Sequence, residues 1–120
     1  ADSYREGYRS LLDAPGPVAF DRFDRGTALE PEVAGIDGAQ RIRAFSRGFY
    51  KLHEADGLVR ISDLRMGAEP NYTFSFAVAR RASALQPLPV AQSVGGRPDV
   101  GRALPWWWRR LWGEPLPPPR

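Results

Sequence analysis

Proline divides this chain into two unequal parts. Of the twelve prolines in the 120 residues, eight lie in the last 40, at Pro87, Pro89, Pro98, Pro105, Pro115, Pro117, Pro118 and Pro119. Because proline has no amide donor and interrupts helices and central strands, this tail cannot supply much of a core. We therefore predict a folded part at residues 1–81. Residues 82–120 should form a linker rich in proline and arginine, then a tryptophan-rich segment that packs on the folded part.

The charge of the chain is as unevenly distributed as its proline. Residues 1–79 hold ten basic and twelve acidic side chains, whereas residues 80–120 hold seven basic and two acidic ones. The net charge of the whole chain is +3. The tail arginines are spread among prolines instead of along one helix face, so we expect solvated surface and no nucleic-acid partner. The chain has no cysteine, which excludes disulfides and thiolate metal sites. No apolar run reaches the roughly 18 residues of a membrane span.

Alternating residues indicate two paired strands at the start of the chain. Tyr4, Glu6 and Tyr8 occupy every second position, which is the period of a strand. Residues 13–17 are rich in proline and glycine and predict a turn, and residues 18–23 have the composition of a second strand. Because the strand pattern begins at once, we expect the chain to have been cut from a longer protein.

Two capping-box spacings follow, in which a side-chain oxygen and a Glu or Gln three residues later satisfy the first helix amides. The first, at residues 27–30, is followed by proline and glycine and supports only a turn or two. The second, from Asp37 to Gln40, opens a segment in which apolar residues recur at helical spacing. Gly48 can close that helix by taking the left-handed conformation. We predict a helix over residues 38–47.

Beyond Gly48 the apolar residues recur with the period of two that is typical of strands. Residues 49–53 and 58–64 are the predicted arms of a hairpin with an Asp-Gly pair at its turn. Residues 72–78 form a further predicted strand, one face of which holds Tyr72, Phe74, Phe76 and Val78. The sequence therefore predicts an α+β fold, with an antiparallel sheet of about five strands, one covering helix and a short C-terminal helix.

The tail carries that C-terminal helix. We expect residues 82–101 to form a loop or linker and residues 104–113 to form the helix. Pro105 then lies near its first turn and Gly113 past its end, where each residue type is favoured.

Four tryptophans in this helix cannot all meet one core. Trp108 and Trp112 share one face, as do Trp107 and Leu111, so some indole rings must be exposed or meet a partner. Two interpretations stay open. The helix packs on the open side of the sheet, or it anchors the domain at a membrane interface, where Trp and Arg side chains sit at headgroup level. The candidate residues for membrane or partner contact are Trp106, Trp107, Trp108, Arg109, Arg110 and Trp112.

One pair of charged residues is the candidate ligand site. Asp63 and Arg65 project to the same side of a predicted strand. They either form an ion pair that fixes the turn at Met66, or bind a ligand. In the second case Arg65 would offer a two-pronged contact to phosphate or carboxylate while Asp63 orients it.

Candidate catalytic groups are few. A hydrolytic zinc site needs about three protein ligands, with histidine prominent, and His53 is the only histidine of the chain. With Glu54, Asp56 and Asp63 it could form a weaker, oxygen-rich site, but a surface or structural side chain is the favoured interpretation. Ser46 lacks the flanking glycines of a nucleophile elbow, and we expect it to bond backbone at the helix end.

Three segments together resemble a known family. Residues 45–50 (Phe-Ser-Arg-Gly-Phe-Tyr), residues 63–67 (Asp-Leu-Arg-Met-Gly) and residues 72–76 (Tyr-Thr-Phe-Ser-Phe) carry the resemblance. They resemble the C-terminal soluble domain of the bacterial membrane-bound metal-dependent hydrolases, also called LexA-binding inner-membrane hydrolases. The resemblance implies a parent at the inner membrane with several N-terminal transmembrane helices. It also implies a divalent metal in that parent, at a histidine-rich motif that has no match in this chain.

We therefore expect an accessory domain that has no complete active site and no cofactor of its own. Its expected partners are the parent's N-terminal transmembrane region and, for the tryptophans, a membrane surface or a second copy of the chain. The arginine-rich tail favours the cytoplasmic side. Two alternatives stay open: part of a metal-dependent active site that the membrane part completes, or anion or nucleotide binding through the scattered arginines.

Overall fold

A hairpin with an Asp-Gly turn starts the main sheet of the computed structural model, which describes residues 2–95 and 100–119. Asp56 and Gly57 have φ angles of 53° and 73°, the left-handed values that a two-residue hairpin turn requires. The sheet is antiparallel, and its strands lie in the order β3 (Tyr50–Ala55), β4 (Leu58–Asp63), β7 (Ser75–Arg81) and β8 (Leu85–Ser93). The hairpin predicted from the sequence is confirmed.

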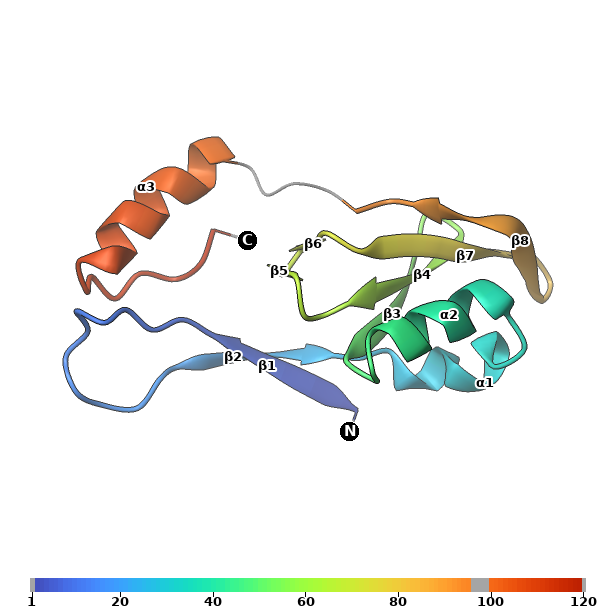
Figure 1. The fold of residues 1–120 in the computed structure, drawn as a ribbon, viewed down its shortest axis with the longest axis horizontal. Helices are drawn as coiled ribbons and strands as arrows, with labels where there is room; N and C mark the ends of the chain where they lie inside the picture. The colour runs from blue at the N-terminus through green and yellow to red at the C-terminus, as the bar shows by residue number, and fades with distance from the viewer. Residues whose placement is uncertain (1, 96–99, 120) are drawn as a thin grey trace.

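Helices cover one face of this sheet (Figure 1). The short helix η1 (Thr27–Leu29) leads into α1 (Glu30–Val33), and α2 (Asp37–Phe45) follows. The core between helices and sheet is aliphatic with one tyrosine and consists of Val33, Ile36, Ala39, Tyr50, Leu52, Val59, Ile61, Val78 and Ala79. The predicted α+β class and its covering helix are therefore confirmed.

The helix α2 begins without the capping box that the sequence predicts. Ile36 occupies the N-cap position, and no side chain caps the helix. The side-chain amide of Gln40 donates instead to the Ala34 carbonyl at 2.8 Å. Asp37 is the first residue of the helix, where its negative carboxylate interacts favourably with the positive end of the helix dipole. The η1 helix likewise has no side-chain cap. Both predicted capping boxes are thus wrong, although a helical segment follows each.

Two successive left-handed residues close α2. Arg47 has a φ of 54° and Gly48 a φ of 85°, and their amides donate to the carbonyls of Ala44 and Arg43, each at 3.2 Å. This pair of bonds satisfies carbonyls that a helix end otherwise leaves unpaired. The fully buried Ser46 donates its hydroxyl to the Arg43 carbonyl at 3.2 Å, which confirms its predicted structural role. Gly48 closes the helix as expected, but it shares the task with Arg47.

The first two strands form a sheet of their own. β1 (Ser3–Gly7) and β2 (Phe20–Asp24) pair with each other, as predicted, but not within the main sheet. After β2 the chain meets the edge of β3, where the Leu52 amide donates to the Arg25 carbonyl at 2.8 Å. Gly26, with a φ of 69°, then turns the chain into η1. The predicted number of strands is too low, because the described residues form eight strands in three sheets.

The strand predicted over residues 72–78 is split in two. Asn71–Tyr72 forms β6, which pairs with β5 (Gly67–Ala68) in a small hairpin, and β7 begins only at Ser75. The bend between them carries Phe74, whose carbonyl accepts the Asp63 amide at 2.9 Å. The aromatic residues therefore do not line one continuous strand face, because the tight β5–β6 hairpin takes Tyr72 out of the main sheet.

β8 occupies a segment that the sequence predicts to be a linker. It pairs with β7 in a register that sets Pro87 opposite Ala79, with a bulge between Ala77 and Ala79. Proline is tolerated there because β8 lies at the edge of the sheet, where outward amides need no ladder partner. The linker prediction is wrong over these nine residues. Part of the predicted linker, residues 96–99, lies outside the described residues.

The tail helix α3 lies beside the β1–β2 loop and not on the open side of the main sheet (Figure 1). It spans Val100–Leu111, so it begins earlier than predicted, and Pro105 lies inside it. The Trp106 ring meets the Tyr8 ring edge-on with 4.9 Å between centroids, and Ala103 is buried. The molecule is correspondingly elongated and measures 50 × 30 × 24 Å.

Two glycines with left-handed backbone allow a matched test of this architecture. We expect Gly26→Ala to lower the unfolding free energy by about 2–4 kcal/mol, because the new Cβ strains the backbone and meets the Leu52 carbonyl. Gly48→Ala carries only the backbone cost, about 1 kcal/mol, since no further described atom lies within 4 Å of its Cβ position. Urea unfolding measures both losses, and equal losses would contradict the close approach at Gly26.

Candidate functional site

The pair predicted as a ligand site forms a closed ion pair. Nε and Nη2 of Arg65 donate to the Asp63 carboxylate at 2.7–3.2 Å, and the Arg65 amide donates to Asp63 Oδ1 at 2.9 Å. Nη2 also donates to the Phe45 carbonyl at 2.7 Å, and the guanidinium lies over the Phe45 ring. Asp63 is only 1% exposed. The pair therefore joins the buried end of β4 to the end of α2.

This geometry supports the structural interpretation of the two residues. Asp63 fills the guanidinium edge, formed by Nε and Nη2, that would grip a phosphate or carboxylate ligand. Hydrogen bonds from Arg65 hold the pKa of the Asp63 carboxyl below its usual value, because they stabilise the charged form. Anion binding by Arg65 stays a prediction, and it would require Asp63 to release this edge.

His53 and the nearby carboxylates lie apart instead of forming a site. His53 stands opposite Arg60 in the β3–β4 ladder, whereas Asp63 is three positions further along β4. Glu54 and Asp56 are each paired with an arginine. Desolvation and two nearby cations lower the pKa of His53, which favours the neutral imidazole at pH 7. Within residues 2–95 and 100–119, no group of three His, Asp or Glu side chains is placed to hold a metal ion.

The tryptophans of α3 divide between an inner and an outer face. Trp106 is half-buried, and its indole N–H donates to the Leu116 carbonyl at 3.3 Å. Trp107, Trp108 and Trp112 are 46%, 65% and 63% exposed, and the last two rings meet edge-on with 5.9 Å between centroids. The prediction that some of the four tryptophans are exposed is confirmed.

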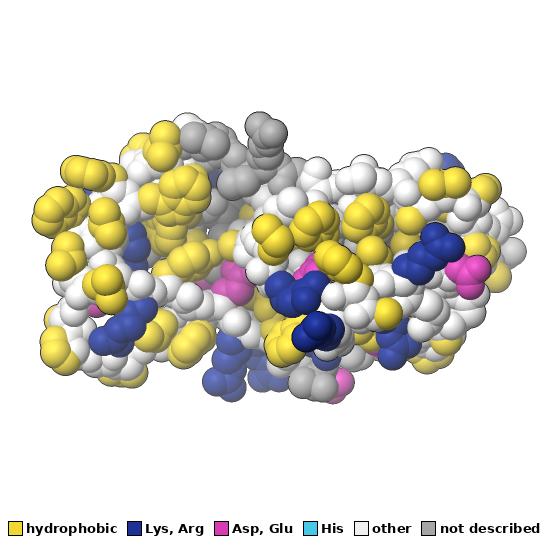
Figure 2. All heavy atoms as spheres, viewed as in Figure 1, with side chains coloured by type: hydrophobic (Ala, Val, Ile, Leu, Met, Phe, Trp, Pro, Cys, Tyr) yellow, Lys and Arg dark blue, Asp and Glu magenta, His cyan; other side chains and the backbone are white. Residues whose placement is uncertain are grey.

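The loop between β1 and β2 adds two leucines to the outer face. Its tip lies against the end of α3, where the Ser10 hydroxyl donates to the Leu111 carbonyl. Gly113 comes so close that a Cβ there would lie 2.7 Å from the Leu12 carbonyl oxygen. We call the combined exposed area the tryptophan surface, and it consists of Leu11, Leu12, Leu104, Trp107, Trp108, Leu111 and Trp112. Figure 2 shows hydrophobic side chains gathered at this end of the molecule.

Arginine ion pairs hold the tryptophan surface together. Arg110 pairs with the Asp13 carboxylate and donates to the Tyr8 carbonyl at 2.8 Å, which fixes α3 on the loop. The same contact lowers the pKa of Asp13 to about 2. Arg109 pairs with Glu114 just past the helix. Both arginines predicted as contact residues therefore also have a structural task.

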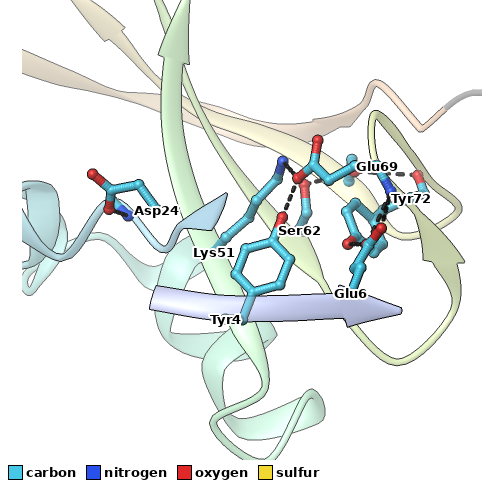
Figure 3. A network of polar contacts seen from close by, with 9 residues as sticks. Tyr4, Glu6, Asp24, Lys51, Ser62, Glu69 and Tyr72 are labelled. Atoms are coloured by element: carbon cyan, nitrogen blue, oxygen red, sulfur yellow. Dashed lines mark hydrogen bonds and ion pairs between the residues drawn. The ribbon is translucent and has the colours of Figure 1, made fainter. Parts of the chain in front are cut away.

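A polar network that the sequence did not indicate ties β1 to the main sheet (Figure 3). Tyr4 and Lys51 both donate to the Glu69 carboxylate, and Tyr72 donates to the Glu6 carboxylate. Glu6 also accepts the Glu69 amide at 3.0 Å. The residues come from β1, β3 and the β5–β6 hairpin, so only the fold brings them together. The alternation in β1 placed Tyr4 and Glu6 on one side, which was the sole local signal.

The network keeps its two tyrosines protonated. Burial and a hydrogen bond to Glu69 raise the pKa of Tyr4, and burial and a hydrogen bond to Glu6 raise the pKa of Tyr72. A phenolate at either position would lose its bond to the carboxylate and be repelled by it. The hydrogen bonds of Tyr4 and Tyr72 hold the arm that carries Leu11 to the body of the protein, and we call them the tyrosine latch.

Comparisons with protein-family models, with curated proteins and with solved structures found no match to this chain. None of the helices in the described residues has the length and apolar character of a membrane span.

We expect Arg65→Gln to lower the unfolding free energy by about 1–3 kcal/mol at pH 7, because Asp63 stays buried without its partner. The pKa of Asp63 is lowered below its usual 3.8. The stabilisation is therefore complete above that value and is lost as the pH falls further. Urea unfolding at pH 7 and in acid measures the loss, with the exposed Arg80→Gln as control. A loss that is the same at both pH values would contradict the ion-pair assignment.

We expect the stability of the protein to fall as the pH rises above about 10, where tyrosines of the unfolded chain ionise but Tyr4 and Tyr72 resist. A raised pKa in the folded state stabilises the fold below the unfolded value and loses its effect above it. The double variant Tyr4→Phe, Tyr72→Phe should therefore show a shallower alkaline decline in urea unfolding. Identical declines in the two proteins would exclude the tyrosine latch.

Proposed function

We propose that this chain is a noncatalytic accessory domain of an integral bacterial inner-membrane protein. The parent would belong to the metal-dependent hydrolase family that residues 45–50, 63–67 and 72–76 resemble. The observation that carries the proposal is the tryptophan surface, since a contiguous exposed apolar area of this kind marks a site of protein or membrane contact. The parent's transmembrane region would be the first partner, and the domain would lie on the cytoplasmic side.

The hydrogen bonds that the candidate catalytic groups make within the protein support the same proposal. Arg65 and Asp63 satisfy each other, and Ser46 is buried with its hydroxyl on a backbone carbonyl. His53 lies apart from the carboxylates that the sequence grouped with it. The fold therefore gives Asp63, Arg65 and Ser46 structural roles.

The competing proposal makes the chain part of a hydrolytic site. Its best support is the buried Asp63 carboxylate beside the Arg65 side chain, which is 40% exposed. In that version the two residues would orient substrate next to a divalent metal whose ligands lie in the parent's membrane part.

Metal retention by the purified chain tests the accessory assignment. We expect far less than one zinc or manganese per chain after dialysis against each metal, measured by elemental analysis, because the part of the chain that the structure describes holds no group of three side chains placed to bind a metal ion. Asp63→Asn should leave that value unchanged. Stoichiometric metal that is lost in Asp63→Asn would contradict the accessory assignment and would place a metal ligand in this chain.

A further inference from the structure

The tryptophan surface has the composition of a lipid-interface contact. Its three tryptophans and four leucines come from one helix and one loop tip. Bulky aromatic and aliphatic side chains bordered by arginine are what the boundary between headgroups and acyl chains accommodates. The opposite face of α3 is occupied by the protein itself, because Ala103 is buried and Trp106 lies against Tyr8. One side of α3 therefore packs on the protein, and the other side exposes the tryptophan surface to solvent.

The dimensions of the surface favour a helix lying along a bilayer. α3 has 12 residues, which is about 18 Å at the helical rise, against about 30 Å for the hydrocarbon layer. Leu104, Trp108 and Leu111 recur at spacings of four and three, so they form one stripe along the helix. The two exposed leucines of the loop lie near the C-terminal end of α3, where the loop backbone approaches Gly113.

The charge at this end of the molecule favours anionic headgroups. Among the described residues, α3 and the β1–β2 loop carry the arginines Arg9, Arg102, Arg109 and Arg110, against the carboxylates of Asp13 and of Glu114 just past the helix. Both carboxylates are already paired with arginines of α3. A second copy of the chain would bring the same positive excess to the contact, whereas anionic lipid complements it.

We infer that the tryptophan surface docks onto an anionic lipid bilayer, with α3 lying in the interface and the leucines of the loop tip inserted beside it. The inference rests on the proposed accessory function and names the partner of its contact surface. The indole and leucine side chains enter the headgroup boundary, and the positive excess at this end of the molecule attracts the lipid phosphates.

Vesicle binding by the full 120-residue chain tests the inference. The probes are vesicles of phosphatidylcholine mixed with phosphatidylglycerol and vesicles of phosphatidylcholine alone. We expect co-sedimentation with the mixed vesicles, a blue shift of tryptophan emission, and binding to the neutral vesicles that is weaker by about tenfold or more. Salt at about 0.5 M should weaken binding to the mixed vesicles without abolishing it, because the apolar contribution remains.

Two variants test the two parts of the surface separately. Trp108→Ala with Trp112→Ala should weaken binding to the mixed vesicles by about tenfold or more, because it removes two exposed rings. Leu11→Ser with Leu12→Ser should weaken it severalfold while leaving α3 unchanged. The second variant lies in an exposed loop, so it remains informative if the tryptophan variant fails to fold by near-ultraviolet circular dichroism.

The matched control removes exposed apolar side chains elsewhere. Phe49 and Val90 are 65% and 75% exposed and lie outside the tryptophan surface. Phe49→Ala with Val90→Ala should bind as the unaltered chain does. A loss as large as that of the tryptophan variant would show general apolar adhesion and overturn the inference.

Two further outcomes would also overturn it. One is the absence of binding by the unaltered chain to the mixed vesicles. The other is a dimer in sedimentation equilibrium that Trp108→Ala dissociates, which would assign the surface to a second copy of the chain. Neither outcome decides the accessory function, because metal retention tests that proposal independently.

Discussion

The ion pair between Arg110 and Asp13 decides where the tail of this protein lies. The two residues are 97 positions apart, and each side chain is 16% exposed. Exposed ion pairs usually contribute little stability, but this one is shielded and is reinforced by the bond from Arg110 to the Tyr8 carbonyl. The ring contact between Tyr8 and Trp106 adds an apolar component. Because these contacts hold α3 on the β1–β2 loop, the exposed tryptophans and leucines form one surface instead of two.

The tyrosine latch fixes this surface relative to the main sheet. Glu69 collects hydrogen bonds from Tyr4 on β1 and Lys51 on β3, so the N-terminal arm is bound to the body through side chains as well as through the backbone bond at Leu52. The aliphatic core therefore lies at one end of the elongated molecule and the tryptophan surface at the other, with a half-buried polar network between them. Because the core and the tryptophan surface share no residues, the protein exposes apolar side chains without removing any from its core.

Local patterns predicted the parts of the fold that local interactions decide. The Asp-Gly pair predicted the β3–β4 hairpin, and helical spacing predicted both α2 and the exposure of some tryptophans. The errors depended on distant neighbours. Pro87 is tolerated because β8 is an edge strand, and Tyr72 is taken out of the main sheet by the β5–β6 hairpin. In the site, Leu11 joins the tryptophans only through the contact of the loop with α3, for which the sequence carries no local signal.

The most direct measurement is a spin-label scan of α3. Because the chain has no cysteine of its own, each label attaches only to the cysteine introduced for it. Single labelled cysteines along the helix report access to oxygen, which concentrates in the bilayer, and to a water-soluble relaxation agent. With anionic vesicles present, we expect oxygen access to follow the helical period, highest at Leu104, Trp108 and Leu111 and lowest at the exposed positions Arg102 and Arg109 on the other side of the helix. Labels that remain equally accessible to the water-soluble agent at all five positions would contradict docking of the tryptophan surface on a bilayer.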